Sequence, residues 1–329
     1  MPPCAHHGAV DVSSGLALGL LAAAMWGTLD VLVAFAGRRV GGVTSAAGVV
    51  GTSCVLVVGY GLATGAAFPT DARPILMSAA AGAISSVGFV CFYTALRLGP
   101  VSIVSPTVAV YGGLASLLAV VVLGERPAPV QVVGAVAATV GIAVAGITMG
   151  RGSGRPRFSG PGVPFALVSL VAWAVSIVAL AQPIREVGWL GASMVARIVN
   201  AGTIVALFLV LRWRDAGSTD MPPLAPEPEP PIDVDATTDD AGRRGGLRAL
   251  VGAHPYTLLL IAGFLETFGF VAFAYGLQIA PAWLVSLASS LGPTVTVTAG
   301  VILFRERPRP VQWAGIGLVL AGIALVAVG

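Results

Sequence analysis

Ten long apolar runs follow one another along the chain and constrain its fold more than any other feature. Each is close to the roughly 20 residues that a helix needs to cross the hydrocarbon core of a bilayer. The runs occupy residues 14–36, 43–63, 75–97, 101–123, 128–149, 163–182, 190–212, 256–279, 281–304 and 310–328. The sequence therefore predicts an all-α integral membrane protein with ten transmembrane helices surrounded by membrane lipid.

The composition excludes a water-soluble fold. Hydrophobic residues make up 56% of the chain and charged residues 10%, whereas soluble domains average about 45–50% and about 25%. The net charge of +3 comes from arginines near the ends of the runs, which orient a membrane protein, so no nucleic-acid partner is expected. The three cysteines lack the spacing of a disulfide framework or a metal site. We expect no metal and no cofactor.

One phrase occurs twice, as "GERPAPVQVVG" at 124–134 and "RERPRPVQWAG" at 305–315. A shift of 181 residues aligns 81–146 with 262–327 and gives 21 identities in 66 positions, where residue frequencies predict roughly a tenth by chance. Trp26 aligns with Trp173 at a shift of 147, so an insertion of about 34 residues separates the two registers. The chain is predicted to contain two five-helix repeats.

The repeats define the predicted domain organisation. A tail (1–13), a first repeat (14–149), a connecting loop (150–162) and a second repeat (163–328) follow in order, and an acidic, proline-rich stretch (213–247) interrupts the second repeat between its second and third helices. That stretch is too polar to fold and is interpreted as a disordered linker, with a regulatory or partner-binding role as the alternative. Because five is odd, the repeats must be inverted, a construction typical of secondary transporters, whose site lies between the repeats.

The ordered strings in both repeats resemble a known family. "FYTALRLGPVSIVSP" in the first repeat corresponds to "FAYGLQIAPAWLVSL" in the second, each is followed by the duplicated phrase, and "MWG" stands at 25–27. The pattern resembles the drug/metabolite transporter superfamily, in the ten-helix form with two EamA-like domains, over residues 14–328 without the acidic stretch. Two positions depart from it: Tyr111-Gly112-Gly113 aligns with Gly292-Pro293, and Ala174 replaces the Gly27 of the first repeat.

The resemblance implies a secondary active transporter in the cytoplasmic (plasma) membrane. Its substrate would be a small metabolite, an amino acid or a drug-like solute, moved by alternating access, by an exporter or a proton-coupled exchanger. A channel or a non-transporting scaffold is the alternative. An intramembrane enzyme is less expected, because the histidines do not cluster in the apolar runs.

Three ionisable residues lie well inside the apolar runs: Asp30, Arg197 and Glu266. A charge at the centre of a spanning helix costs about 2.5–3.5 kcal/mol on insertion scales, so such residues usually face a cavity or a partner. Asp30 and Glu266 are candidates for binding a proton or a cationic group, and Arg197 for binding a substrate carboxylate. The alternative is a structural Arg197–Glu266 pair, with Asp30 bonded to neighbouring helices.

Aromatic and hydroxyl side chains complete the predicted site. The substrate-binding candidates are Trp26, Tyr93, Ser105, Tyr111, Trp173, Arg197, Tyr275, Ser289 and Ser290. Bonds between helices are the ordinary role of membrane serines. Helix breaks often mark the site of a transporter, and the candidate hinges are Pro106, Gly112, Gly113, Gly292 and Pro293. A static kink that only shapes packing is the other interpretation.

Glu125 and Glu306 occupy the same place in the duplicated phrase, where prolines end one helix and begin the next. We interpret both as structural corners, with a gate at each mouth as the alternative.

Two indications of the orientation in the membrane, the arginine count and the family resemblance, disagree. With a cytoplasmic N-terminus, the inside loops hold only three arginines and the opposite loops fourteen, so the positive-inside rule places both termini outside. The family resemblance implies cytoplasmic termini instead.

Overall fold

The computed structural model describes residues 12–98, 104, 107–145, 161–217, 254–292 and 310–328. This part of the chain forms ten α-helices and no strand. The helices are α1 (Val12–Val40), α2 (Gly42–Ala63), α3 (Ala72–Leu98), α5 (Tyr111–Val122), α6 (Pro129–Ala145), α7 (Val163–Val187), α8 (Trp189–Gly217), α10 (Pro255–Ile279), α11 (Ala282–Ser289) and α13 (Pro310–Val328). Every helix lies on one of the predicted apolar runs.

Six helices are long and apolar enough to cross a membrane: α1, α2, α3, α7, α8 and α10. Three further apolar segments are shorter, at Thr107–Val122, Pro129–Val144 and Trp313–Val328. The prediction of an all-helical membrane protein is confirmed. Half of the run at 281–304, from residue 293 on, and most of the acidic stretch at 213–247 lie outside the described residues.

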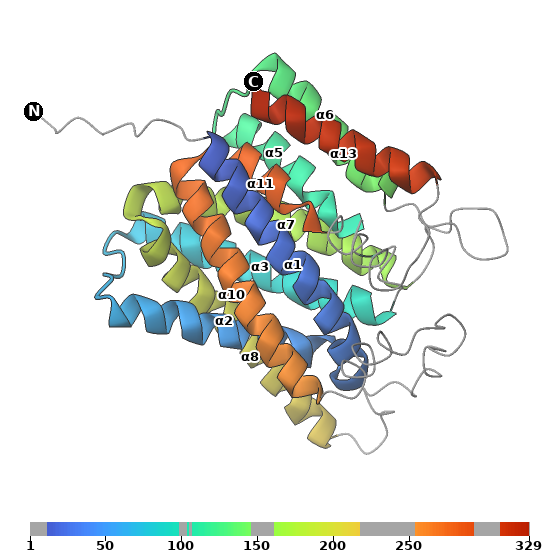
Figure 1. Ribbon diagram of the computed structural model, residues 1–329. Coiled ribbons are helices and arrows are strands. Elements are labelled where there is room, and N and C mark those ends of the chain that lie inside the picture. Colours follow the sequence, from blue (N-terminus) through green and yellow to red (C-terminus); the bar gives the residue numbers. More distant parts are fainter. Residues whose placement is uncertain are drawn as a thin grey trace, which may run out of the picture.

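The helices associate in pairs that join distant parts of the sequence. The main pairs are α6 with α13, α1 with α10, α3 with α7, α3 with α8, α2 with α8, α2 with α10, and α5 with α11. In Figure 1, α6 and α13 lie side by side at one edge of the bundle, and α1 runs along α10 across the front of the view. Each pair combines a helix before residue 150 with one after it, so the two halves of the chain are interleaved.

Glycines permit two kinds of close geometry in this bundle. Gly41 and Gly188 have a φ of 86° at the short connections α1–α2 and α7–α8, a conformation that costs glycine little. In the α6–α13 pair, a Cβ on Gly134 would lie 2.6 Å from the carbonyl oxygen of Gly322, and the reverse substitution would meet the same conflict. These two helices therefore approach more closely than side chains would allow, as small residues often permit in membranes.

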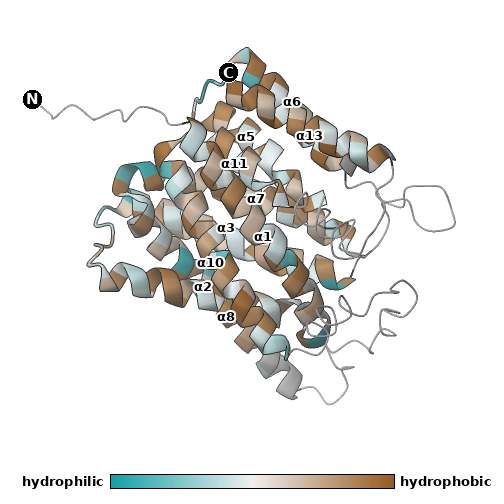
Figure 2. Cartoon of the chain, in the orientation of Figure 1, coloured by the Kyte–Doolittle hydropathy of each residue, from teal (hydrophilic) through white to brown (hydrophobic). Residues whose placement is uncertain are grey.

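The outer faces of the helices are apolar. Val55 and Val121 are each 72% exposed and Phe268 is 62% exposed, and Figure 2 shows hydrophobic residues along much of the length of the helices. In water such a surface would be unfavourable, whereas lipid is as apolar as these side chains. A set of polar side chains, Asp30, Arg197, Asn200 and Glu266 among them, is buried inside the bundle.

Candidate functional site

A cavity lies inside the bundle between the two halves of the chain. Side chains of α1, α3, α5, α7, α8, α10 and α11 line it. The space between the atoms amounts to about 960 Å³, including the part that opens to the exterior. Sites for small molecules combine apolar walls with a few polar groups, and the wall of this cavity has that composition.

An ion pair crosses one side of the cavity. Nη2 of Arg197 on α8 donates to Oε1 of Glu266 on α10 over 2.7 Å, and both side chains are at most 3% exposed. The guanidinium also lies over the ring of Phe270, 3.5 Å from its centroid. Glu266 and Phe270 are one turn apart on the same face of α10, so a single helix face supplies both contacts.

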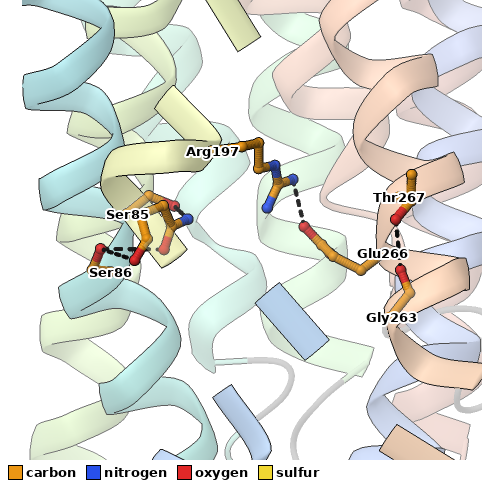
Figure 3. Close-up of polar contacts among 7 residues, drawn as sticks. Ser85, Ser86, Arg197, Gly263, Glu266 and Thr267 are labelled. Carbon is orange, nitrogen blue, oxygen red and sulfur yellow. Dashed lines mark hydrogen bonds and ion pairs between the residues drawn. The ribbon is translucent and has the colours of Figure 1, made fainter. Parts of the chain in front are cut away.

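The same stretch of α8 is bonded to α3. Ser86 donates to the backbone and side-chain oxygens of Asn200, at 3.2 Å each, and the amide of Asn200 donates to Ser85 over 3.4 Å. Figure 3 shows this cluster on one side and the Arg197–Glu266 contact on the other. Asn200 is one turn from Arg197, so the bonds to α3 fix the position from which Arg197 reaches α10.

Two tryptophans form the aromatic walls, and each lies against a glycine. A Cβ on Gly88 would lie 2.5 Å from Trp173, and a Cβ on Gly269 would lie 2.8 Å from Nε1 of Trp26. Trp173 contacts three aromatic rings, at centroid distances of 5.1 Å to Phe92, 5.3 Å to Phe89 and 5.8 Å to Tyr111. Trp26 contacts Phe273 at 5.5 Å.

Helices α5 and α11 close against each other beside the cavity. The hydroxyl groups of Tyr111 and Ser289 share a hydrogen bond of 3.2 Å. Further along, Ser116 donates to the carbonyl of Trp283 over 2.7 Å. A Cβ on Gly112 would lie 2.2 Å from the hydroxyl of Ser290, so a glycine is required for this contact.

Most of the described site candidates lie at the cavity. Its lining includes Trp26, Asp30, Tyr93, Tyr111, Trp173, Arg197, Glu266, Ser289, Ser290 and Gly292. Tyr275 does not line it. This side chain is 44% exposed and packs against Trp189 with ring centroids 6.4 Å apart, because its position on α10 faces away from the interior.

The hinge candidates have different positions. Gly112 and Gly113 lie within the continuous helix α5, against Ser290 and Thr139, and Gly292 lies close to the backbone of Gly27. The described glycines thus serve close packing in this conformation. Ser105, Pro106, Pro293 and Glu306 lie outside the described residues.

Glu125 joins the two halves of the chain at one end of α11. Its carboxylate accepts from the backbone N–H groups of Ala282 and Trp283, at 2.9 Å each, and pairs with Arg185 at the end of α7. A carboxylate at a helix N-terminus satisfies free N–H groups and interacts favourably with the helix dipole. The sequence predicted a corner here but not these partners.

Several lining residues are not among the candidates that the sequence indicates. The main ones are Phe89, Phe92, Phe270, Phe273, Ser176 and Asn200. A signal existed for four of them: at the shift of 181, Phe89 aligns with Phe270 and Phe92 with Phe273. The glycines beneath the tryptophans, Gly88 and Gly269, align in the same way.

The fold and the cavity define a multi-pass helical membrane protein with an internal site of mixed aromatic and polar character. The model of the EamA-like transporter family matches residues 13–147 and 241–328. The chain belongs to this family, and it is therefore a membrane transporter of the drug/metabolite transporter kind. A solved crystal structure of a protein has a TM-score of 0.70 with this chain at 17% identity, over 96% of this chain and 97% of its own; that likeness concerns the fold alone. Among curated protein sequences, none matches.

Proposed function

We propose that the protein is a secondary active transporter of a small solute in the plasma membrane. It would work by alternating access, as an exporter or a proton-coupled exchanger, and the cavity would be its substrate site. The observation that carries this proposal is the cavity itself, which lies between the two halves of the chain and contains Asp30, Arg197 and Glu266. Ionisable residues at such depth in a membrane protein commonly mark a substrate or proton pathway.

The helix pairs support an arrangement as two inverted five-helix repeats. If α1, α2, α3, α5 and α6 correspond to α7, α8, α10, α11 and α13, exchanging the halves converts the α1–α10 pair into α7–α3, and both pairs occur. The same exchange converts Trp26 on Gly269 into Trp173 on Gly88, and both contacts occur. Two halves with matching contacts can exchange inward- and outward-facing shapes, as alternating access requires.

Filling the cavity is expected to stop transport. Ile177 on α7 lines the cavity, so Ile177→Trp places an indole in the substrate's space and flux should fall to background. Val175, two residues away, is 39% exposed, and Val175→Trp is the matched control that should keep most of the flux. The solute is first identified by comparing metabolites in the medium of cells with and without the gene, and its uptake is then measured in proteoliposomes. Equal flux in both variants, with both proteins folded, would contradict the proposal.

Asp30 is the proposed proton-binding residue. It lies one turn from Trp26 on α1, and both line the cavity. We expect Asp30→Asn to abolish flux driven by a pH gradient while solute binding and passive exchange persist, because the amide cannot exchange a proton. Accumulation driven by the pH gradient at the wild-type rate would remove Asp30 from the coupling mechanism.

A further inference from the structure

Several buried hydrogen-bond donors belong to residues that line the cavity. Nε and Nη1 of Arg197 and the hydroxyl of Tyr93 have no hydrogen-bond partner within the described part of the chain. In Figure 3 the guanidinium of Arg197 makes one contact, from a single nitrogen to Glu266. Arginine has five N–H donors and no acceptor, so most of its donor capacity is unused. Buried donors of this kind require an explanation.

The donors share one cavity. Tyr93 on α3, Arg197 on α8 and Glu266 on α10 all line it. The indole of Trp26 also lies near Glu266, although its N–H makes no hydrogen bond of ordinary geometry. Arginine with neighbouring neutral donors is the combination that binds carboxylates.

Much of the remaining cavity wall is apolar. The rings of Phe89, Phe92 and Trp173 form one aromatic cluster in it, and Phe273 packs on the ring of Trp26. A ligand that satisfies both the donors and these rings has an acidic head and an apolar or aromatic body.

Charge balance adds a further condition. Among the described lining residues, two carboxylates, Asp30 and Glu266, accompany the single guanidinium of Arg197. A bound carboxylate would add another negative charge to a buried space, where an uncompensated charge is costly. Uptake of one proton returns the net charge of these groups to its value before the carboxylate binds.

We infer that the cavity binds an organic carboxylate with an apolar body, and that this carboxylate takes the place of Glu266 on Arg197 while Glu266 takes up a proton. In the absence of substrate, Glu266 then occupies the place of the substrate carboxylate on Arg197 and keeps this side chain paired and ordered. This inference rests on the proposed function and refines it. The carboxylate and the proton on Glu266 bind together rather than in competition. This proton is linked to substrate binding, whereas the proton that couples flux to the pH gradient is the one assigned to Asp30.

Within the described ranges, the other charged or titratable groups around this pair come from four helices. They are Asp30 on α1, Cys54 on α2, Tyr93 on α3 and Tyr111 on α5. Cys54 and Tyr93 interact electrostatically with Arg197, and both tyrosines interact with Glu266. Asp30 interacts with the two tyrosines. Asp30 is the only other carboxylate among them, so it is the residue that must be separated from Glu266 in a test.

The test uses four probes with the same phenyl body: 3-phenylpropionate, its amide, 3-phenylpropylamine and phenylalanine. Binding to the purified full-length protein in nanodiscs is measured by equilibrium dialysis. We expect 3-phenylpropionate to bind at least tenfold more tightly than the amide or the amine. Phenylalanine carries the same acid group and an added amine. An affinity for phenylalanine equal to or lower than that for 3-phenylpropionate fits a site that recognises the acid group. Tighter binding of the amine, equal binding of acid and amide, or no binding of the acid would each overturn the inference.

The variants test the exchange with Glu266. Between about pH 6 and 8 a free carboxylate stays ionised, so wild-type affinity for 3-phenylpropionate should weaken with rising pH, by up to about tenfold per unit for one linked proton. Glu266→Gln mimics the protonated residue and should bind the acid at least as tightly, without this pH dependence. Asp30→Asn should keep the pH dependence of this affinity. If the pH dependence disappeared in Asp30→Asn and persisted in Glu266→Gln, the linked proton would bind to Asp30 and not to Glu266. That result would overturn the proposed exchange of carboxylates on Arg197.

A last variant separates this inference from the proposed function. Arg197→Gln/Glu266→Gln removes both charges and leaves none unpaired, and we expect it to fold and to lose the preference for acid over amide. A preference retained in this double variant would overturn the role of Arg197. Failure of the proposed function has a different signature, which is the absence of flux for any solute in wild-type proteoliposomes.

Discussion

Replacing Arg197 alone by glutamine is expected to destabilise the protein by about 3–5 kcal/mol, because it leaves the carboxylate of Glu266 buried without its partner. Glu266 is only 2% exposed, so without the guanidinium its carboxyl group must either stay charged in a buried position or take up a proton, and both cost stability. The double variant Arg197→Gln/Glu266→Gln should recover most of the loss, since neither charge remains. The midpoint of thermal unfolding in detergent measures both effects.

An exposed pair provides the control for this prediction. Arg73 and Glu186 lie 3.3 Å apart, and their side chains are 66% and 32% exposed. Exposed pairs contribute about 0–1 kcal/mol, so Arg73→Gln should change the unfolding midpoint little. If Arg197→Gln were as stable as the double variant, the pair would not be coupled and its description as a buried ion pair would fail.

Loss of Glu125 is expected to have the second largest effect, about 2–3 kcal/mol. Glu125→Ala removes two hydrogen bonds from the N-terminus of α11 and the partner of Arg185. Helix caps contribute about 0.5–2 kcal/mol and hydrogen bonds to charged groups about 1.5–3 kcal/mol. Glu186→Ala is the matched control, since that carboxylate has only the exposed pair with Arg73. Thermal unfolding again gives the measurement.

The same variant distinguishes a corner from a gate. As a corner, Glu125 affects only how much protein is folded, so flux per folded molecule in Glu125→Ala should equal that of the wild type. Unchanged stability together with altered flux per folded molecule would mean that Glu125 is a gate.

The fold was largely predictable because its determinants are local. A helix that crosses a membrane must bond its own backbone internally, so the length of each apolar run indicates a helix directly. The boundaries of α2, Gly42–Ala63, and α13, Pro310–Val328, differ by at most one residue from the predicted runs. The repeat at a shift of 181 adds a relation between distant segments that ordinary sequences lack.

The site was predictable only where a residue type is costly in a membrane. Asp30, Arg197 and Glu266 stand out in apolar runs for that reason, and the pairing of the last two was foreseen as one alternative. Phe89 and Phe92 do not stand out, because an apolar residue is equally acceptable against lipid, a helix or a ligand. The sequence also does not show which face of α10 points into the cavity. Tyr275 was therefore predicted to bind substrate, although the rotation of α10 places it on the outer face. The partners of Glu125 depend on how α11 docks, which local sequence does not encode.

Access to the cavity from the two sides of the membrane tests the central claim most directly. Ser289 lines the cavity, and Ser289→Cys in a background with Cys4, Cys54 and Cys91 replaced by alanine provides a single thiol. Membrane-impermeant reagents are applied to right-side-out and inverted vesicles, with and without the transported solute. Alternating access predicts labelling from both faces, with the solute raising it on one face and lowering it on the other. Labelling from one face only, or a solute that raises labelling on both faces together as a channel would, contradicts the account.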